Sequence, residues 1–300
     1  MMPPMLLSGK LFTIATIIFS LVSTSIYSSF LLSIFLFKTI KKVPELYLFY
    51  CHFGYDICCS FAMFLNVLIM LLSTTDAVQF FIDNRNFAFF IVYPVYLLSS
   101  MRALLVLFIE VGRTFATYFP ILFFKYRKSI PTLLFVAITL VYAVFDVSVM
   151  FIFCGDSIDV PPGCISIMCA LSKCYLNYWL TYEKIIYSLT IIISLLLSLK
   201  LFWMNHKQEK INDDLRRANL LALIDFCIIV IFDMTPPLIV SHFPNFYPYM
   251  GPVNAFFKTM GFVIEGYLIS RNLMRNEKKW KTKMVKPSTT SICSKNKAEQ

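Results

Sequence analysis

Seven long apolar runs, each broken by few or no charged residues, constrain this chain more than any other feature. The first run, residues 11–37, contains no Asp, Glu, Lys or Arg. A helix needs roughly 20 apolar residues to cross a hydrocarbon core of about 30 Å, and every run reaches that length. The seven runs are residues 11–37, 46–72, 88–112, 130–153, 183–204, 219–243 and 252–273. They predict an all-α membrane protein, a seven-transmembrane helix bundle over residues 11–273.

Composition excludes an ordinary soluble enzyme and a disordered chain. Hydrophobic residues make up 58% of the 300-residue chain and charged residues 15%, whereas soluble domains have about 45–50% and about 25%. The net charge of +10 would suggest a nucleic-acid partner in a soluble protein. Here the basic residues lie between the apolar runs, where they set the membrane topology, so we expect no nucleic-acid binding.

The basic residues favour one side of the membrane. If the N-terminus is outside, 21 of the 27 Lys and Arg residues fall in the cytoplasmic connections and the tail, and three fall outside. This bias follows the positive-inside rule. We therefore predict a short extracellular N-terminus at residues 1–10 and a basic cytoplasmic tail at residues 274–300. The Lys-rich stretch around Trp280 should adsorb to the anionic inner leaflet of the bilayer.

Ionisable side chains inside the predicted helices fall into two layers when their depth is counted at about 1.5 Å per residue. Such residues are costly in a membrane, so they mark a function or a buried partner. Asp56, a carboxylate in the second predicted helix, belongs to neither of the two layers. The inner layer, which we interpret as an ion-pair lock, consists of Arg102, Asp225 and Glu265. The outer layer, which is the candidate ligand contact, consists of Asp146, Asp233 and Lys258. The alternative for both layers is a set of ion pairs that fix helix register and touch no ligand.

Two prolines, Pro236 and Pro237, follow Asp233 in the predicted sixth helix. Proline removes a backbone donor and clashes with the preceding turn, so a kink is expected there. A kinked helix beside charged groups could serve as a hinge between two arrangements of the bundle. Membrane helices also tolerate proline without such a role.

A cluster of cysteines lies in the outer segment between the predicted fourth and fifth helices. Its predicted location is oxidising, so one or two disulfides are expected, and the spacing leaves their connectivity open. A zinc site is the less favoured alternative, because no histidine lies at ligand spacing. Elsewhere no catalytic or metal-ligating set emerges, so we predict no enzymatic activity and no cofactor. The disulfide candidates are Cys154, Cys164, Cys169 and Cys174.

The inner end of the third helix carries a motif that resembles a known family. Residues 113–127 read RTFATYFPILFFKYR, and Pro131 follows. Glu110 and Arg113 are three residues apart, a spacing at which they can pair on a helix, and Pro120 should end that helix. The run resembles the nematode serpentine chemoreceptors, most closely serpentine receptor class BC, a class B-like group.

The resemblance implies a G-protein-coupled receptor of the plasma membrane on the cilia of sensory neurons. Such a receptor binds an environmental chemical, here a small-molecule or peptide ligand, and activates a heterotrimeric G protein. By that analogy Arg113 corresponds to the arginine at the inner end of the third helix of rhodopsin-like receptors. A membrane transporter or ligand-gated ion channel is the alternative, since layers of opposite charge could line a polar path.

The chain departs from the rhodopsin-like pattern in three places. Gly112 precedes Arg113 where those receptors have an acid, so Glu110 is the candidate substitute. The outer start of the third helix has no cysteine for the usual disulfide. The last helix ends GYLISRN and has no Asn-Pro-x-x-Tyr sequence. The activation mechanics of rhodopsin-like receptors therefore transfer only loosely.

Overall fold

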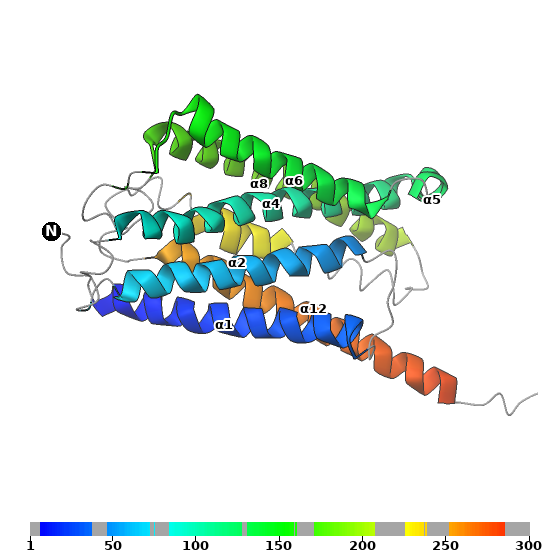
Figure 1. Cartoon of the computed structure of the whole chain (residues 1–300). Coiled ribbons are helices and arrows are strands. Elements are labelled where there is room, and N and C mark those ends of the chain that lie inside the picture. The colour runs from blue at the N-terminus through cyan, green and yellow to red at the C-terminus, as the bar shows by residue number, and fades with distance from the viewer. Residues whose placement is uncertain are drawn as a thin grey trace, which may run out of the picture.

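The computed structural model is an elongated bundle of helices that run along one common axis (Figure 1). It describes residues 7–37, 47–72, 75, 84–127, 131–158, 160, 171–207, 226–236, 238 and 252–285. The helices are α1 (Leu7–Phe35), α2 (Tyr47–Leu72), α4 (Arg85–Tyr118), α5 (Pro120–Arg127), α6 (Thr132–Ser148), α8 (Lys173–Lys207) and α12 (Val253–Val285). The described residues also include two π-helical turns, η2 (Val149–Phe153) at the end of α6 and η3 (Ile229–Met234).

Five of the described helices are long and apolar enough to cross a membrane. They are Leu7–Phe35, Tyr47–Leu72, Phe89–Tyr118, Thr132–Phe153 and Lys173–Met204. The helical segment around η3 and the helix α12 occupy the positions of the sixth and seventh predicted runs. α8 begins at Lys173 rather than near residue 183, which places its first turns beside the end of η2.

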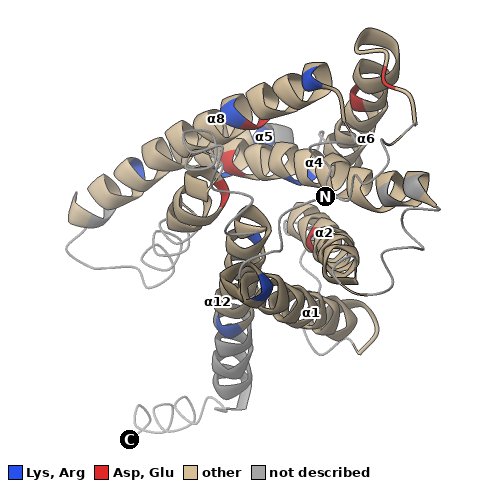
Figure 2. Ribbon diagram, turned by 90° about the vertical axis from the view of Figure 1, so that its left-hand side faces the viewer, with Lys and Arg blue, Asp and Glu red and all other residues tan. Residues whose placement is uncertain are grey.

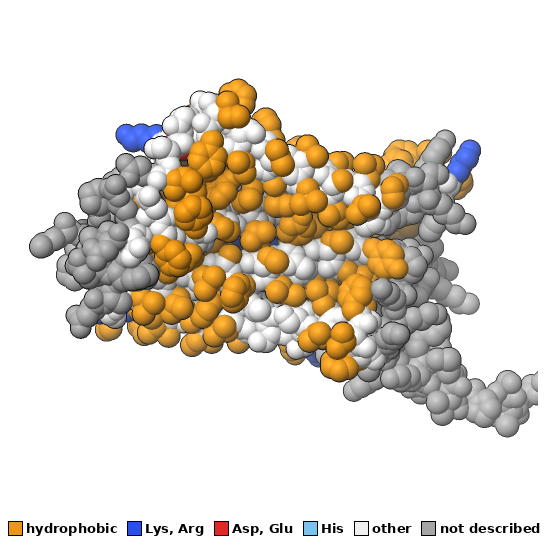
Figure 3. All heavy atoms as spheres, in the orientation of Figure 1, with side chains coloured by type: hydrophobic (Ala, Val, Ile, Leu, Met, Phe, Trp, Pro, Cys, Tyr) orange, Lys and Arg blue, Asp and Glu red, His pale blue; other side chains and the backbone are white. Residues whose placement is uncertain are grey.

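Hydrophobic side chains cover much of the surface of the bundle, as contact with lipid requires. Large hydrophobic side chains stay exposed along its whole length, among them Leu133, Val141 and Ile152 with at least 69% of their surface accessible. Figure 3 shows hydrophobic side chains over most of one face, with basic side chains near the two ends. In water such a surface would be unstable, whereas lipid tails solvate it.

The face of α1 that turns inward is small and polar. Its buried positions recur every three or four residues and begin Gly9, Thr13, Thr16, Ser20 and Ser23. Small residues let membrane helices approach closely, and hydroxyl groups bond across the interface. Ser23 Oγ donates to Ser60 Oγ of α2 at 2.7 Å, a contact of this kind.

α12 and η3 also meet through a glycine. A Cβ added at Gly261 of α12 would lie 2.8 Å from Cβ of Phe232 in η3, so a larger residue would push these segments apart. Figure 2 looks along the bundle and shows α4 between α2 on one side and α8 on the other. α4 therefore lies where side chains from several helices converge.

Cys154 and Cys174 form a disulfide that ties the end of η2 to the start of α8. It lies at the end of the bundle where α1 begins, beside a buried cluster that includes Phe89, Met150 and Tyr175. Cys164 and Cys169 lie outside the described residues. The disulfide closes a chain segment whose ends are 20 residues apart.

Replacing Cys154 by Ser should lower the apparent melting temperature of the purified protein. Loss of a crosslink across a loop of this length costs about 3 kcal/mol when chain entropy dominates. The matched control is Cys58→Ser, because Cys58 is a free and exposed cysteine of α2. Equal melting temperatures for the two variants would show that the disulfide does not stabilise this end of the bundle.

Candidate functional site

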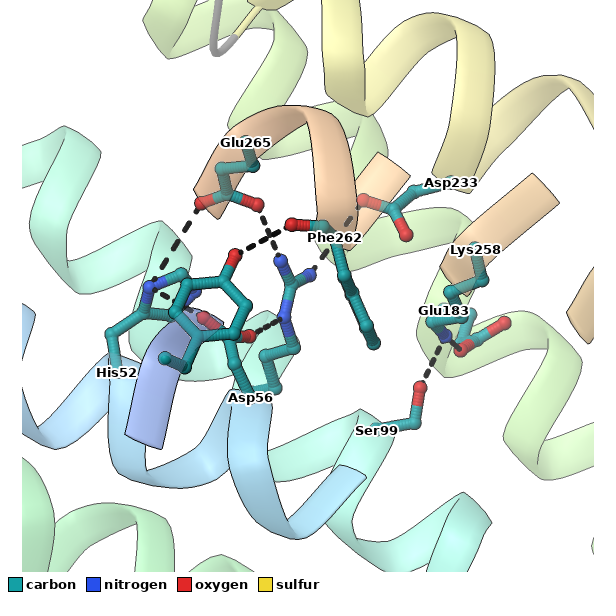
Figure 4. Close-up of polar contacts among 10 residues, drawn as sticks. His52, Asp56, Ser99, Glu183, Asp233, Lys258, Phe262 and Glu265 are labelled. Carbon is teal, nitrogen blue, oxygen red and sulfur yellow. Dashed lines mark hydrogen bonds and ion pairs between the residues drawn. The ribbon is translucent and has the colours of Figure 1, made fainter. Parts of the chain in front are cut away.

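The guanidinium of Arg102 in α4 is buried, and it contacts the labelled carboxylates of Asp56, Asp233 and Glu265 (Figure 4). Its Nε donates to Asp56 Oδ1 of α2 at 2.5 Å, and its Nη2 donates to Glu265 Oε2 of α12 at 2.9 Å. Its Nη1 lies 3.7 Å from Asp233 Oδ2 in η3. The planar guanidinium presents five donors in a fixed fork, so this one side chain connects four helical segments.

The ring of Phe262 in α12 covers Arg102, with the guanidinium carbon 4.3 Å from the ring centroid. An aromatic face attracts a cation and excludes water from it. Tyr27 of α1 donates to the carbonyl oxygen of Phe262 at 3.1 Å, which fixes that turn of α12. The network around Arg102 is thus held on its apolar side by α1 and α12.

His52 lies on the other side of the same carboxylates. Its Nδ1 is 3.3 Å from Asp56 Oδ2, one turn further along α2, and 4.0 Å from Glu265 Oε1. These three residues are the described group that could hold a metal ion, since their ligand atoms all lie within 4.8 Å of one another. His52 and Asp56 are both buried.

A second ion pair lies one turn from Arg102 along α4. Lys258 of α12 donates to Glu183 Oε1 of α8 at 3.5 Å and to Ser99 Oγ of α4. Its ammonium lies 6.0 Å from the ring centroid of Tyr187. Figure 4 shows this pair and the Arg102 network side by side. Because Ser99 and Arg102 share one face of α4, movement of α12 would disturb both groups.

Asp146 of α6 forms a separate polar group with tyrosines. It accepts from Tyr175 at 2.7 Å, from Tyr93 at 3.3 Å and from Tyr142 at 3.4 Å. The ring of Tyr142 stacks on that of Tyr182 with centroids 4.6 Å apart. Within the described part of the chain, no basic side chain pairs with this carboxylate.

At the far end of α4, Glu110 accepts from Arg113 at 3.0 Å and from Ser194 of α8 at 3.2 Å. The guanidinium of Arg113 also lies 5.6 Å from the ring centroid of Phe49 in α2. The spacing of Glu110 and Arg113 predicted their contact, and it is present. α4 ends at Tyr118, two residues before Pro120.

The structure gives the three residues of the predicted outer layer separate partners. Asp233 contacts Arg102, whereas Lys258 pairs with Glu183, and Asp146 lies among tyrosines apart from both. The depth count assumed a regular α-helix, but Asp233 lies in a π-helical turn, whose wider spacing changes the direction of the side chain. The long side chain of Arg102 also reaches carboxylates at different depths.

The described part of the predicted inner layer contains one ion pair. Arg102 and Glu265 are paired, but Asp225 lies outside the described residues. The sequence analysis missed His52 and Glu183 and left Asp56 unassigned. Glu183 was taken as the first residue of a helix that in fact starts ten residues earlier, at Lys173. The signal for His52 was its spacing of four residues from Asp56, which puts both on one helical face.

The comparison with protein families decides which class of protein contains this site. The family model for the serpentine type 7TM GPCR chemoreceptor Srbc matches residues 5–277. The chain belongs to this family. No curated protein matches the sequence. Membership confirms the predicted all-α, seven-helix class and the resemblance found at the inner end of the third helix. The charged interior described above is therefore that of an Srbc chemoreceptor, a multi-pass membrane protein.

Replacing Arg102 by Met should strongly destabilise this Srbc receptor. The substitution leaves three carboxylates facing one another without their cation, and breaking a buried ion pair in this way costs about 3–5 kcal/mol. The readout is the melting temperature of the detergent-purified protein. The matched control is Arg271→Met, since Arg271 is an exposed residue of α12.

If both variants melt at the same temperature, Arg102 is not the element that holds the helices together. Partial rescue of Arg102→Met by Glu265→Gln is also expected, because that change removes one uncompensated charge.

Proposed function

We propose that this receptor binds a small-molecule or peptide cue in the half of the bundle that contains the disulfide, and activates a heterotrimeric G protein at the opposite end. The proposal places the disulfide end outside the cell and the basic tail in the cytoplasm. We further propose that the receptor acts in the plasma membrane of sensory cilia. The observation that carries it is the Arg102 network, since one group joins helices that reach both ends.

The ligand end contains chemistry suited to a small polar cue. Asp146 is a buried carboxylate among tyrosine hydroxyls, with Tyr96 and Trp179 in contact nearby at 4.6 Å between centroids. Ligand sites combine apolar and aromatic walls with a few convergent polar groups. We propose that the ligand contacts Asp146 directly and reaches toward Lys258.

The proposed signal passes through Lys258 and Asp233. Lys258 bonds Ser99 in α4 and Glu183 in α8, and α12 also carries Glu265, which holds Arg102. A ligand that draws Lys258 away would release α12 from α8 and change the contacts of Arg102. Asp233, proposed from sequence as a ligand contact, is better placed to transmit the change.

The predicted sixth helix supplies a candidate moving part. η3 carries Asp233, and Pro236 lies two residues after the end of this π-helical turn. π turns occur often at functional sites, and proline leaves a backbone carbonyl without its helical donor. The ligand shifts the population toward the arrangement that it binds better, and this difference in affinity is the whole driving force.

The inner end offers the G-protein contact. Arg113 is held by Glu110 and lies against Phe49. We propose that rearrangement of α4 relative to α8 separates Glu110 from Ser194 and frees Arg113 to meet the G protein. The basic tail adds attraction to anionic lipid at the same surface.

Arg113→Ala should abolish agonist-dependent signalling in cells that carry a promiscuous G-protein reporter, because it removes the proposed G-protein contact. Glu110→Gln should raise basal signalling, since it weakens the contact that restrains Arg113. The agonist is found first by screening the wild-type receptor against panels of water-soluble and volatile chemicals. Surface expression of every variant is measured in parallel.

The matched control is Lys200→Ala. Lys200 is a basic residue in the last turns of α8, and its ammonium contacts the rings of Tyr118 and Trp203. Signalling by Arg113→Ala at the wild-type level would contradict the proposed coupling site.

In the same assay Asp146→Asn should raise the agonist concentration for half-maximal response and leave the maximum unchanged, because it weakens the proposed ligand contact. Ligand-dependent current in reconstituted vesicles without any G protein would favour a channel instead.

A further inference from the structure

The two carboxylates that flank Arg102 each turn their second oxygen toward His52. Asp56 uses Oδ1, and Glu265 uses Oε2, to accept from the guanidinium. Asp56 Oδ2 lies 3.3 Å, and Glu265 Oε1 lies 4.0 Å, from His52 Nδ1 (Figure 4). One imidazole nitrogen and two carboxylate oxygens from two helices thus face one another beside a cation that occupies only the other two oxygens.

Carboxylates are concentrated in this part of the described interior. Those of Asp56, Asp233 and Glu265 surround the guanidinium of Arg102. The neighbouring pair of Lys258 and Glu183 is neutral by itself. A divalent cation is attracted to such a concentration of carboxylates.

Hydrogen bonding leaves one of the three atoms that face one another, Asp56 Oδ2, unsatisfied. Asp56 Oδ2 and His52 Nε2 are buried, and neither has a hydrogen-bond partner. Asp56 is fully buried and His52 is 3% exposed. Most buried polar atoms in proteins are hydrogen bonded, so an exception needs an explanation. A bound cation would satisfy Asp56 Oδ2.

The spacing of the three ligand atoms fits a metal ion. Bonds of about 2.0–2.2 Å from zinc to nitrogen or oxygen put tetrahedral ligand atoms about 3.4 Å apart. The separations of 3.3 Å and 4.0 Å lie near that value, and all three atoms lie within 4.8 Å of one another. His52 and Asp56 are four residues apart on α2, which brings both side chains to one helical face.

We propose that His52 Nδ1, Asp56 Oδ2 and Glu265 Oε1 bind a divalent transition-metal ion of the zinc type. Imidazole and carboxylate ligands suit such an ion, and it would supply the partner that the buried Asp56 Oδ2 lacks. The ion joins α2 to α12 directly beside Arg102. Metal binding would therefore stabilise the arrangement of helices that Arg102 holds, whatever ligand acts at the other end of the bundle.

The test uses the full-length receptor in nanodiscs after removal of metal with a chelator. Zn²⁺ at about 100 times its dissociation constant should raise the melting temperature by several degrees, because it binds only the folded state. His52→Gln should weaken binding more than about tenfold. The matched control, His206→Gln, should bind like the wild type, because His206 is an exposed histidine of α8.

Thiols could bind zinc as well, since Cys51, Cys58 and Cys59 lie close by on α2. Co²⁺ bound to the wild-type protein discriminates the two cases and needs no variant to fold. We expect visible bands of nitrogen and oxygen coordination without the intense near-ultraviolet band of a cobalt–thiolate bond.

Three results would overturn the proposal: no stabilisation of the wild type by Zn²⁺, equal stabilisation of His52→Gln, or a thiolate spectrum. Stability that responds to pH but not to metal would also overturn it, and would show that protons balance the cluster.

Discussion

The cost of burying charge in a membrane interior is the constraint on which the rest of this structure depends. Arg102 lies among lipid-solvated helices, where an isolated guanidinium would be highly unfavourable. It is tolerated because carboxylates from α2, η3 and α12 surround it and Phe262 covers it. Each of these helices can occupy only those positions in which its acidic residue reaches the same cation. The ion pairs therefore determine the arrangement more than they add to stability.

Lipid also explains where the polar residues lie. α1 buries serines and threonines and exposes leucines and isoleucines, the reverse of a helix in a soluble protein. No hydrophobic force drives membrane helices together, so close packing of small residues and hydrogen bonds take that role. The contact between Ser23 and Ser60 and the close approach at Gly261 follow from this requirement. The same logic makes the charged interior a candidate place for function, because ionisable groups inside a membrane are costly.

Sequence patterns predicted the features that depend on one helix at a time. Run length predicted the seven-helix class, and a spacing of three residues predicted the contact between Glu110 and Arg113. Features that depend on several helices were harder. Depth along an ideal helix grouped Asp233 with Lys258, but it could not show that Asp233 contacts Arg102, because a π-helical turn and the reach of the Arg102 side chain are not visible in it.

The start of α8 illustrates a second limit. The stretch from Lys173 to Tyr182 is polar and aromatic, so hydropathy starts the predicted helix too late and leaves Glu183 at its edge. In the structure Glu183 is well inside the helix and pairs with Lys258. Tyrosine clusters such as that around Asp146 show how a helix can continue through residues that hydropathy does not favour.

The central claim is that Arg102 and Asp56 interact directly and hold α4 to α2. A double-mutant cycle measures this interaction most directly, with Arg102→Met, Asp56→Asn and the double variant compared by reversible unfolding in mixed detergent micelles. We predict a coupling free energy of about 1–3 kcal/mol, as found for residues that share one network. Additive effects, with a coupling free energy near zero, would contradict the account.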